Sequence, residues 1–147
     1  MRAATLALIG LALVLAGPAA HADAVLQAFG GAYRDGRLQS YVDGIAQALA
    51  PALGLPDGAW RVQILNTPEI NAFAAAGARL YVTRGLLANA RDEAELAGVV
   101  GHEMAHVVAG HSYFSTEHAA EGGFSPAQEF EADALSVQAL ARLGYDP

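Results

Sequence analysis

The sequence predicts an α+β domain in which a small antiparallel sheet packs on a helical core. Apolar residues recur at three- and four-residue spacing in three separate segments, which is typical of amphipathic helices. They alternate with polar residues in two short segments after the first of these helices, which is typical of strands. A chain of 147 residues is long enough for one small domain and not for two.

The first predicted elements are a helix followed by two strands. The segment LQSYVDGIAQALAPALGL, residues 38–55, has the helical spacing and ends at Gly54, before a proline. In RVQILN, residues 61–66, Val62 and Ile64 share one face and suit a strand. ARLYVTRG, residues 78–85, alternates in the same way, and we expect the two strands to pair as antiparallel neighbours.

Capping residues place the next two helices. Asp92 is a good N-cap, and Glu95 three residues later completes a capping box for a helix that runs to about Gly110. After a polar, glycine-containing loop, Ser125 is the N-cap of a last helix with proline in its first position. This helix is expected to end at Gly144.

The N-terminal segment predicts a secretory signal peptide, residues 1–22, in front of a mature domain, residues 23–147. Arg2 is followed by an apolar run over residues 6–16 and by the small-residue cleavage pattern Ala20-His21-Ala22. A membrane anchor is the alternative, but the run is well short of the ~20 apolar residues that cross a bilayer. We therefore expect an exported chain, periplasmic or secreted.

The composition argues against some classes of partner. A formal net charge of −7 disfavours binding to nucleic acid and to anionic membrane surfaces. The chain has no cysteine, so neither a disulfide nor a thiol ligand is available. No second apolar run is long enough to span a membrane, so we expect no integral membrane segment once the signal is removed.

The segment VVGHEMAHVVAGH, residues 99–111, carries the chemistry. His102 and His106 are four residues apart on a helix, so both imidazoles lie on one face and can bind one zinc ion. Glu103 lies one step round the helix, where it can take a proton from the attacking water. The alternative is a core helix whose histidines only form hydrogen bonds. Burial of the Glu103 charge between them would then cost several kcal/mol unless the side chain is protonated.

A third metal ligand has to come from elsewhere, since catalytic zinc usually has three protein ligands. The acidic residues downstream are Glu117, Glu121, Glu129, Glu131 and Asp133. Glu129 and Asp133 share one face of the last helix, so we expect Glu129 to bind the metal and Asp133 to accept a hydrogen bond from a histidine. Glu131 is about 200° round from Glu129 and is expected to face solvent. The residues expected to pack beside the ligand face are Phe130, Ala134 and Val137.

His111 is treated separately from the two motif histidines. An extended zinc motif would place glycine at position 109 and histidine at position 112, but the chain has Ala109 and Ser112 there. On a continuous helix His111 lies about 140° from His106. We therefore expect His111 to be a surface or outer-shell residue at the helix end.

Three segments, taken in order, carry a family resemblance: NAFAAAGARLYVTRGLL, GHEMAHVVAGH and EFEADALSVQALARLGYDP. They resemble motifs of the zinc metallopeptidases that include the CAAX prenyl proteases and the HtpX protease. The resemblance implies a zincin core of the gluzincin type, with His102, His106 and Glu129 as ligands of one Zn²⁺ per chain. It also implies Glu103 as general base and Asp133 as a supporting residue. Arg79 to Arg84 is then the strand beside an extended substrate.

The function that these motifs imply is a zinc-dependent metalloendopeptidase. Its substrates would be extended or misfolded envelope proteins, recognised through their main chain. The alternative is a zinc-bound module that holds extended segments without cutting them. Possible hydrogen-bond donors to the reaction's oxyanion are His111, Tyr113, His118 and Arg142.

Overall fold

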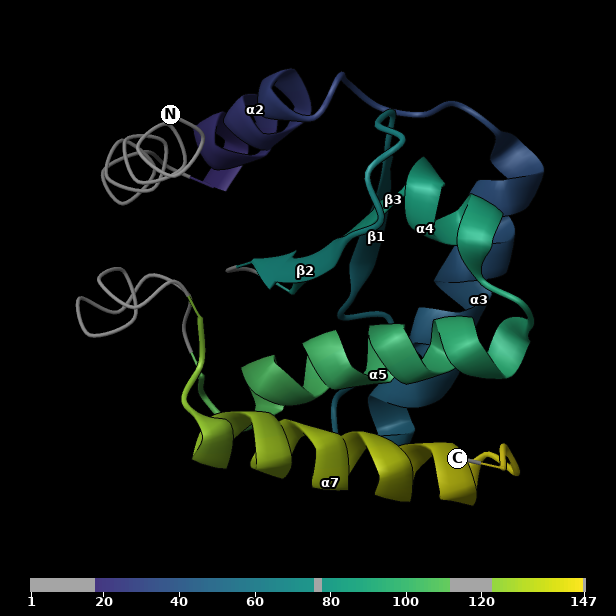
Figure 1. Ribbon diagram of the computed structural model, residues 1–147, viewed down its shortest axis with the longest axis vertical. Helices are drawn as coiled ribbons and strands as arrows, with labels where there is room; N and C mark the ends of the chain where they lie inside the picture. Colours follow the sequence, from purple (N-terminus) through teal and green to yellow (C-terminus); the bar gives the residue numbers. More distant parts are fainter. Residues whose placement is uncertain (1–17, 76–77, 112–122, 147) are drawn as a thin grey trace.

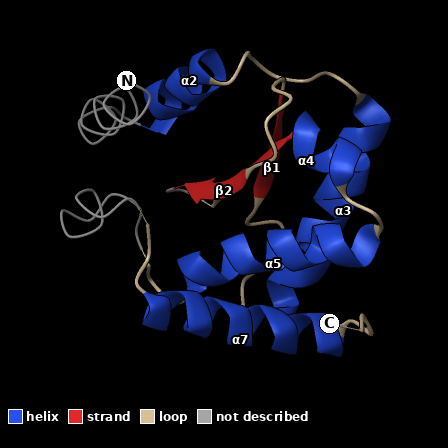
Figure 2. Ribbon diagram, in the orientation of Figure 1, coloured by secondary structure: helices blue, strands red, loops and turns tan. Residues whose placement is uncertain are grey.

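The structure is a computed structural model that describes residues 18–75, 78–111 and 123–146. Three predicted helices and two predicted strands are present, and the chain adds two shorter helices and one strand. Within the described residues the elements are α2 (Pro18–Ala28), α3 (Gly36–Ala52), β1 (Arg61–Leu65), β2 (Ala72–Ala75), β3 (Arg79–Thr83), α4 (Arg84–Asn89), α5 (Glu93–Val108) and α7 (Pro126–Arg142). Figures 1 and 2 show their arrangement.

The sheet lies between two apolar clusters. One face, with Val62, Ile64 and Leu80, packs against α3 and α5 in the main core. The opposite face contributes Leu65 and Tyr81 to a smaller cluster with α2. Helix α7 lies along α5 on the side away from the sheet (Figure 1). None of the described helices is long and apolar enough to span a bilayer.

The predicted antiparallel pairing of the first two expected strands is wrong. The strand order is β1-β3-β2, and β1 runs parallel to β3, with Val62 beside Leu80. The reason is β2, which pairs antiparallel with β3 and adds a second reversal of chain direction between β1 and β3. Arg79 to Arg84 was expected to lie beside a substrate, but β3 is the central strand and Arg84 already belongs to α4.

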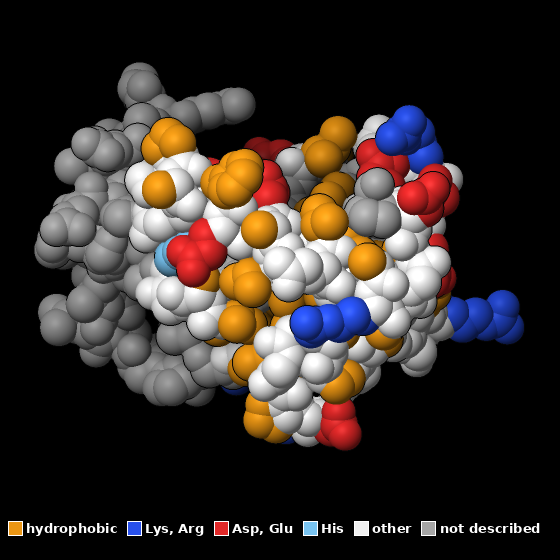
Figure 3. All heavy atoms as spheres, turned by 90° about the horizontal axis from the view of Figure 1, so that it is seen from below, with side chains coloured by type: hydrophobic (Ala, Val, Ile, Leu, Met, Phe, Trp, Pro, Cys, Tyr) orange, Lys and Arg blue, Asp and Glu red, His pale blue; other side chains and the backbone are white. Residues whose placement is uncertain are grey.

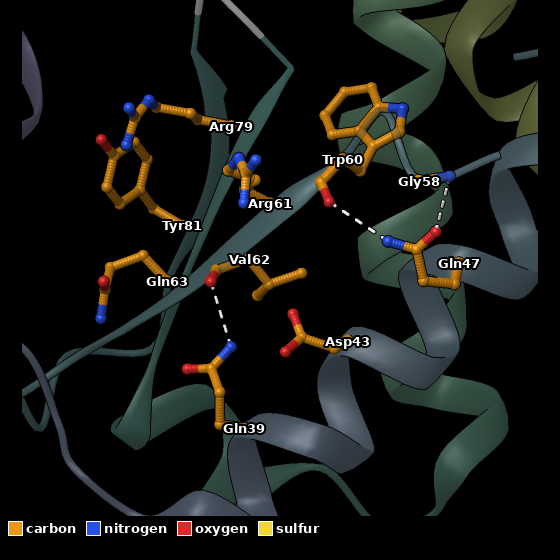
Figure 4. Close-up of a pocket in the computed structure, with 10 residues that line it drawn as sticks. All are labelled: Gln39, Asp43, Gln47, Gly58, Trp60, Arg61, Val62, Gln63, Arg79 and Tyr81. Atoms are coloured by element: carbon orange, nitrogen blue, oxygen red, sulfur yellow. Dashed lines mark hydrogen bonds between the residues drawn. The ribbon is translucent and has the colours of Figure 1, made fainter. Parts of the chain in front are cut away.

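Main-chain groups at the outer edge of β1 are occupied by other parts of the protein. Gln39 and Gln47 of α3 donate their side-chain amides to the carbonyl oxygens of Val62 and Trp60, at 3.0 and 3.2 Å (Figure 4). The amide of Tyr33 donates to the oxygen of Ile64 at 2.9 Å. Because its carbonyl groups already have donors, this edge does not offer a continuous row of free groups to another strand.

Two helix starts use the predicted caps, with one difference. Asp92 accepts a hydrogen bond from the amide of Glu95 at 2.9 Å, as expected. The Glu95 carboxylate, however, accepts from the amide of Arg91 and not from that of Asp92, so the expected capping box is only half formed. At α7 the box is complete, since Ser125 and Gln128 each accept from the other's amide.

Small residues allow α5 and α7 to pack closely. A Cβ atom added at Gly101 would lie 2.8 Å from the hydroxyl of Ser136, which is itself buried. Ala132 and Ala139 flank Ser136 on the same buried face of α7. Where α5 begins and α7 ends, the Tyr145 hydroxyl donates to Glu93 in the first turn of α5 at 2.7 Å. The two helices are therefore antiparallel, with close packing in the middle and a side-chain hydrogen bond at one end.

The expected apolar flank of α7 faces outward. Phe130 is 77% exposed and Val137 is 47% exposed, and Ala134 is also exposed. Apolar side chains are visible on this side of the molecule in Figure 3, near a histidine and acidic side chains. The expectation that these residues pack beside the ligand face is wrong, because Ala132, Ser136 and Ala139 occupy the contact with α5.

Alanine substitutions at two glycines of α5 test this packing. Replacing Gly98, where an added Cβ meets nothing within 4 Å, should raise the free energy of unfolding by up to about 1 kcal/mol through helix propensity. The same change at Gly101 should give no gain or a loss of about 1 to 2 kcal/mol, because it crowds Ser136. Urea denaturation of both variants measures the difference. Equal effects at the two positions would contradict close packing at Gly101.

Candidate metal centre

Three side chains converge where the second half of α5 meets the first turns of α7. The Nε2 atoms of His102 and His106 lie 3.0 Å apart. One carboxylate oxygen of Glu129 lies 3.2 Å from the first and 3.6 Å from the second. Ligands of a tetrahedral zinc ion, each at about 2.1 Å from it, are roughly 3.4 Å apart. Two imidazole nitrogens and a carboxylate oxygen at these separations fit one metal ion.

Asp133 lies next to His102, on the ring atom that faces away from the cluster. Its carboxylate is 2.9 Å from the Nδ1 atom of His102. A carboxylate in this position holds the proton on Nδ1 and directs the Nε2 lone pair toward a metal ion. Asp133 and Glu129 are four residues apart on α7, so one helix face supplies both carboxylates.

His106 is the most enclosed of the three. It is 1% exposed, and the ring of Phe124 stacks on its imidazole with centroids 3.9 Å apart and an interplanar angle of 16°. Burial, together with the neighbouring His102, lowers the pKa of His106 to about 4. The imidazole is therefore neutral at neutral pH, which is the form that binds metal.

Two residues that were expected outside the ligand set lie around it. Of the surface and outer-shell positions expected for His111, the structure shows the outer-shell position, because its side chain is 6% exposed and its Nδ1 atom lies 3.0 Å from Nδ1 of His106. Glu131 is largely exposed, as expected, and its carboxylate also lies 3.3 Å from Nε2 of His111. The angle of 140° between His106 and His111, which assumes a continuous helix, does not apply because α5 ends at Val108.

Of the remaining predicted residues, the structure describes Glu103 and Arg142. Glu103 lies on α5 directly after His102 and is buried, with 8% of its surface exposed. Arg142 donates to the carbonyl oxygen of Ala52 at 2.7 Å, at the opposite end of α7 from Glu129, which argues against a role beside the histidines. The candidates that lie outside the described residues are Tyr113, Glu117, His118 and Glu121.

Sequence reasoning did not identify Phe124 or the link between His106 and His111. The signal for the second was present, because Gly110 directly precedes His111. A glycine just after a helix commonly takes a left-handed conformation and turns the next residue back onto the last turn. For Phe124 we find no signal in the local sequence pattern.

Comparison with known proteins supports the motif interpretation. The profile of Peptidase family M48 matches residues 34–121, which is more than half of the chain. The chain belongs to this family. It is 31% identical to the mitochondrial metalloendopeptidase OMA1 of Arabidopsis thaliana over 60% of the chain, and 35% identical to that of Schizosaccharomyces pombe over 49%. It is 44% identical to a protease HtpX homolog of Acidiphilium cryptum over 48%.

The family member described here matches only part of these longer relatives. The alignments cover 24% of the Arabidopsis thaliana protein, 21% of the Schizosaccharomyces pombe protein and 24% of the Acidiphilium cryptum protein. The segment shared with the family profile includes His102, Glu103 and His106, whereas Glu129 follows its end. Membership in a metallopeptidase family therefore agrees with the two histidines, and Glu129 depends on the geometry.

The low pKa of His106 predicts how the stability of the metal-free chain changes with pH. The unfolded chain binds a proton at this residue near pH 6.5, but the folded chain does so only near pH 4. Stability from this group is therefore fully present above pH 6.5 and falls as the pH is lowered toward 4, by on the order of 1 to 3 kcal/mol. Urea denaturation between pH 8 and 4.5, with chelator present, measures it. His106→Gln should have a shallower pH dependence, and an unchanged slope would contradict the assignment.

Proposed function

We propose that this chain is a zinc-dependent metalloendopeptidase domain of the gluzincin type. The observation that carries the proposal is the convergence of two imidazoles and a carboxylate, within 3.6 Å of one another, beside the buried Glu103. His102, His106 and Glu129 hold one zinc ion per chain in this proposal. When bound, zinc supplies a Lewis acid that polarises the scissile carbonyl and activates water.

Glu103 acts as the general base in the proposed reaction. It takes a proton from the attacking water and passes it to the leaving amine, which breaks the peptide bond and leaves a carboxylate product. Its position favours this role, because Glu103 is buried and lies directly after the ligand His102 on α5. Asp133 holds the ring of His102 in position through the 2.9 Å contact and does not touch the reacting atoms.

The substrate binds as an extended strand along β2. Thr83 donates its amide to the oxygen of Asn71, so by antiparallel alternation the main-chain groups of Ala72 and Ala74 point away from β3. Helix α5, which carries both histidines, packs against β2 (Figure 1), so a peptide on this edge would lie beside that helix. The outer edge of β1 is occupied, which leaves β2 as the favoured edge for strand addition.

Main-chain recognition favours unfolded segments over a particular side-chain sequence. Because a peptide must be extended to pair with β2, a folded protein is a poor substrate and a misfolded one is a good one. The N-terminal signal pattern supports substrates in the cell envelope. The relatives named as metalloendopeptidases and proteases agree with peptide-bond hydrolysis, although the chain covers only a fifth to a quarter of them.

Two substitutions separate catalysis from metal binding. Glu103→Gln keeps the shape of the side chain but removes the base, so cleavage of an unfolded protein should fall at least about 100-fold while zinc stays bound. Glu129→Gln should instead lower zinc affinity, because it removes a charged ligand. Both are measured by digestion of an unfolded reporter protein and by zinc content after dialysis.

The outcome also distinguishes the alternative function. If the wild-type chain binds zinc and unfolded protein without chelator-sensitive cleavage, it is a binding module and not a peptidase. If Glu103→Gln loses zinc together with activity, Glu103 is a ligand or a structural residue, and its assignment as base is wrong.

Export is tested by the mass of the mature chain. Protein recovered from the envelope fraction or the medium of a secreting host should begin at Asp23, because the signal is expected to be cut after Ala22. Helix α2 of the full chain crosses this position. Recovery of the chain from that fraction with residues 1–22 still attached would contradict cleavage.

A further inference from the structure

The end of α5 turns His111 back onto His106. Gly110 has a φ angle of 74°, in the left-handed region, and its amide donates to the oxygen of Val107 at 3.1 Å. The amide of His111 donates to the oxygen of His106 at 2.8 Å. These two bonds form a Schellman motif, in which the residue after the glycine packs against the last helical turn. The backbone therefore sets which residue lies behind the His106 ring.

Hydrogen bonds continue from His106 to the surface through this residue. The Nδ1 atoms of His106 and His111 are 3.0 Å apart, and Nε2 of His111 is 3.3 Å from the Glu131 carboxylate. The imidazole of His111 is 6% exposed, whereas the Glu131 side chain is 59% exposed. A buried imidazole thus connects a second buried imidazole to a carboxylate that keeps its contact with water.

With Glu131 ionised and His111 neutral, the chemistry of the three groups sets the direction of these hydrogen bonds. An ionised carboxylate only accepts, so Nε2 of His111 must be the donor to Glu131. A neutral imidazole with its proton on Nε2 has an acceptor at Nδ1, so His111 accepts from Nδ1–H of His106. The lone pair of His106 is then on Nε2, which faces His102 and Glu129.

We propose that Glu131 and His111 select the metal-binding tautomer of His106, with His111 as a positioning residue. The inference rests on the proposed metal-binding function, because the tautomer matters only if His106 holds a metal ion. Phe124 supports the same orientation by stacking on the His106 ring, at a centroid separation of 3.9 Å. The reacting atoms are not touched by His111, which acts through His106 alone.

His106 and His102 differ in how a carboxylate can reach the ring atom behind the metal-facing nitrogen. The His102 side chain is 26% exposed, and Asp133 reaches its Nδ1 atom directly while remaining 68% exposed. His106 is 1% exposed, and a carboxylate placed directly behind it would have to leave water at a large cost in free energy. With a neutral His111 between His106 and Glu131, His106 still has an acceptor for its Nδ1–H, and the charged carboxylate stays at the surface.

The tautomers themselves can be measured in the metal-free protein. Long-range ¹H–¹⁵N correlation spectra at pH 8 should show His106 protonated at Nδ1 and His111 protonated at Nε2. Asp133→Ala, which acts on His102, should leave both unchanged. Spectra in which His106 carries its proton on Nε2 would overturn the proposal, and this test does not depend on zinc binding or on proteolysis.

Two substitutions at His111 test the consequence for metal binding. Gln has an acceptor oxygen for His106 and a donor amide for Glu131, so His111→Gln should change zinc affinity by no more than about threefold. His111→Leu fills much of the same space but offers no acceptor, and should weaken zinc binding by about 10- to 100-fold. Competition with a chromophoric chelator measures affinity, and circular dichroism checks that both variants are folded.

The possible results separate the two proposals. Equal loss of affinity in His111→Gln and His111→Leu, or no loss in either, would overturn the positioning role. A wild-type chain that binds no zinc at all would instead contradict the proposed function. The tautomer measurement would still decide whether Glu131 and His111 set the tautomer of His106.

Discussion

The close contact between α5 and α7 is the constraint on which the candidate site depends. The two imidazoles come from α5 and the carboxylate from α7, so the ligand set exists only if the helices stay in register. A slide of one residue moves a helix by about 1.5 Å along its axis, which would separate these atoms. Gly101 against Ser136 fixes the distance, and Tyr145 on Glu93 fixes the far end.

The sequence predicts the elements whose determinants are local. Apolar spacing and a capping residue lie within a few positions of each other, so α3, α5, α7, β1 and β3 could be read directly. Strand β2 was not predicted from its own pattern, because Ala72–Ala75 has three alanines, and alanine is not favoured in strands. The parallel pairing of β1 and β3 depends on β2, so it could not be predicted either.

The same limit applies to the candidate site. Reasoning from helical angles places Glu129 and Asp133 on one face, and it works because both lie inside a regular helix. It fails for His111, since the helix ends and Gly110 reverses the chain before that residue. The partners of Glu131 could not be found for the same reason, because its contact is with His111. Angular arguments hold only as far as the hydrogen bonds of the helix continue.

The amide groups of Gln39 and Gln47 on β1 have a consequence for self-association. Growth of a β-sheet polymer requires two available edges on every molecule, one to receive a strand and one to offer it. With β1 closed by α3, strand-to-strand association through the described sheet stops at a pair of molecules joined by their β2 strands. With one edge closed in this way, the sheet lacks the second edge that growth of a fibril requires.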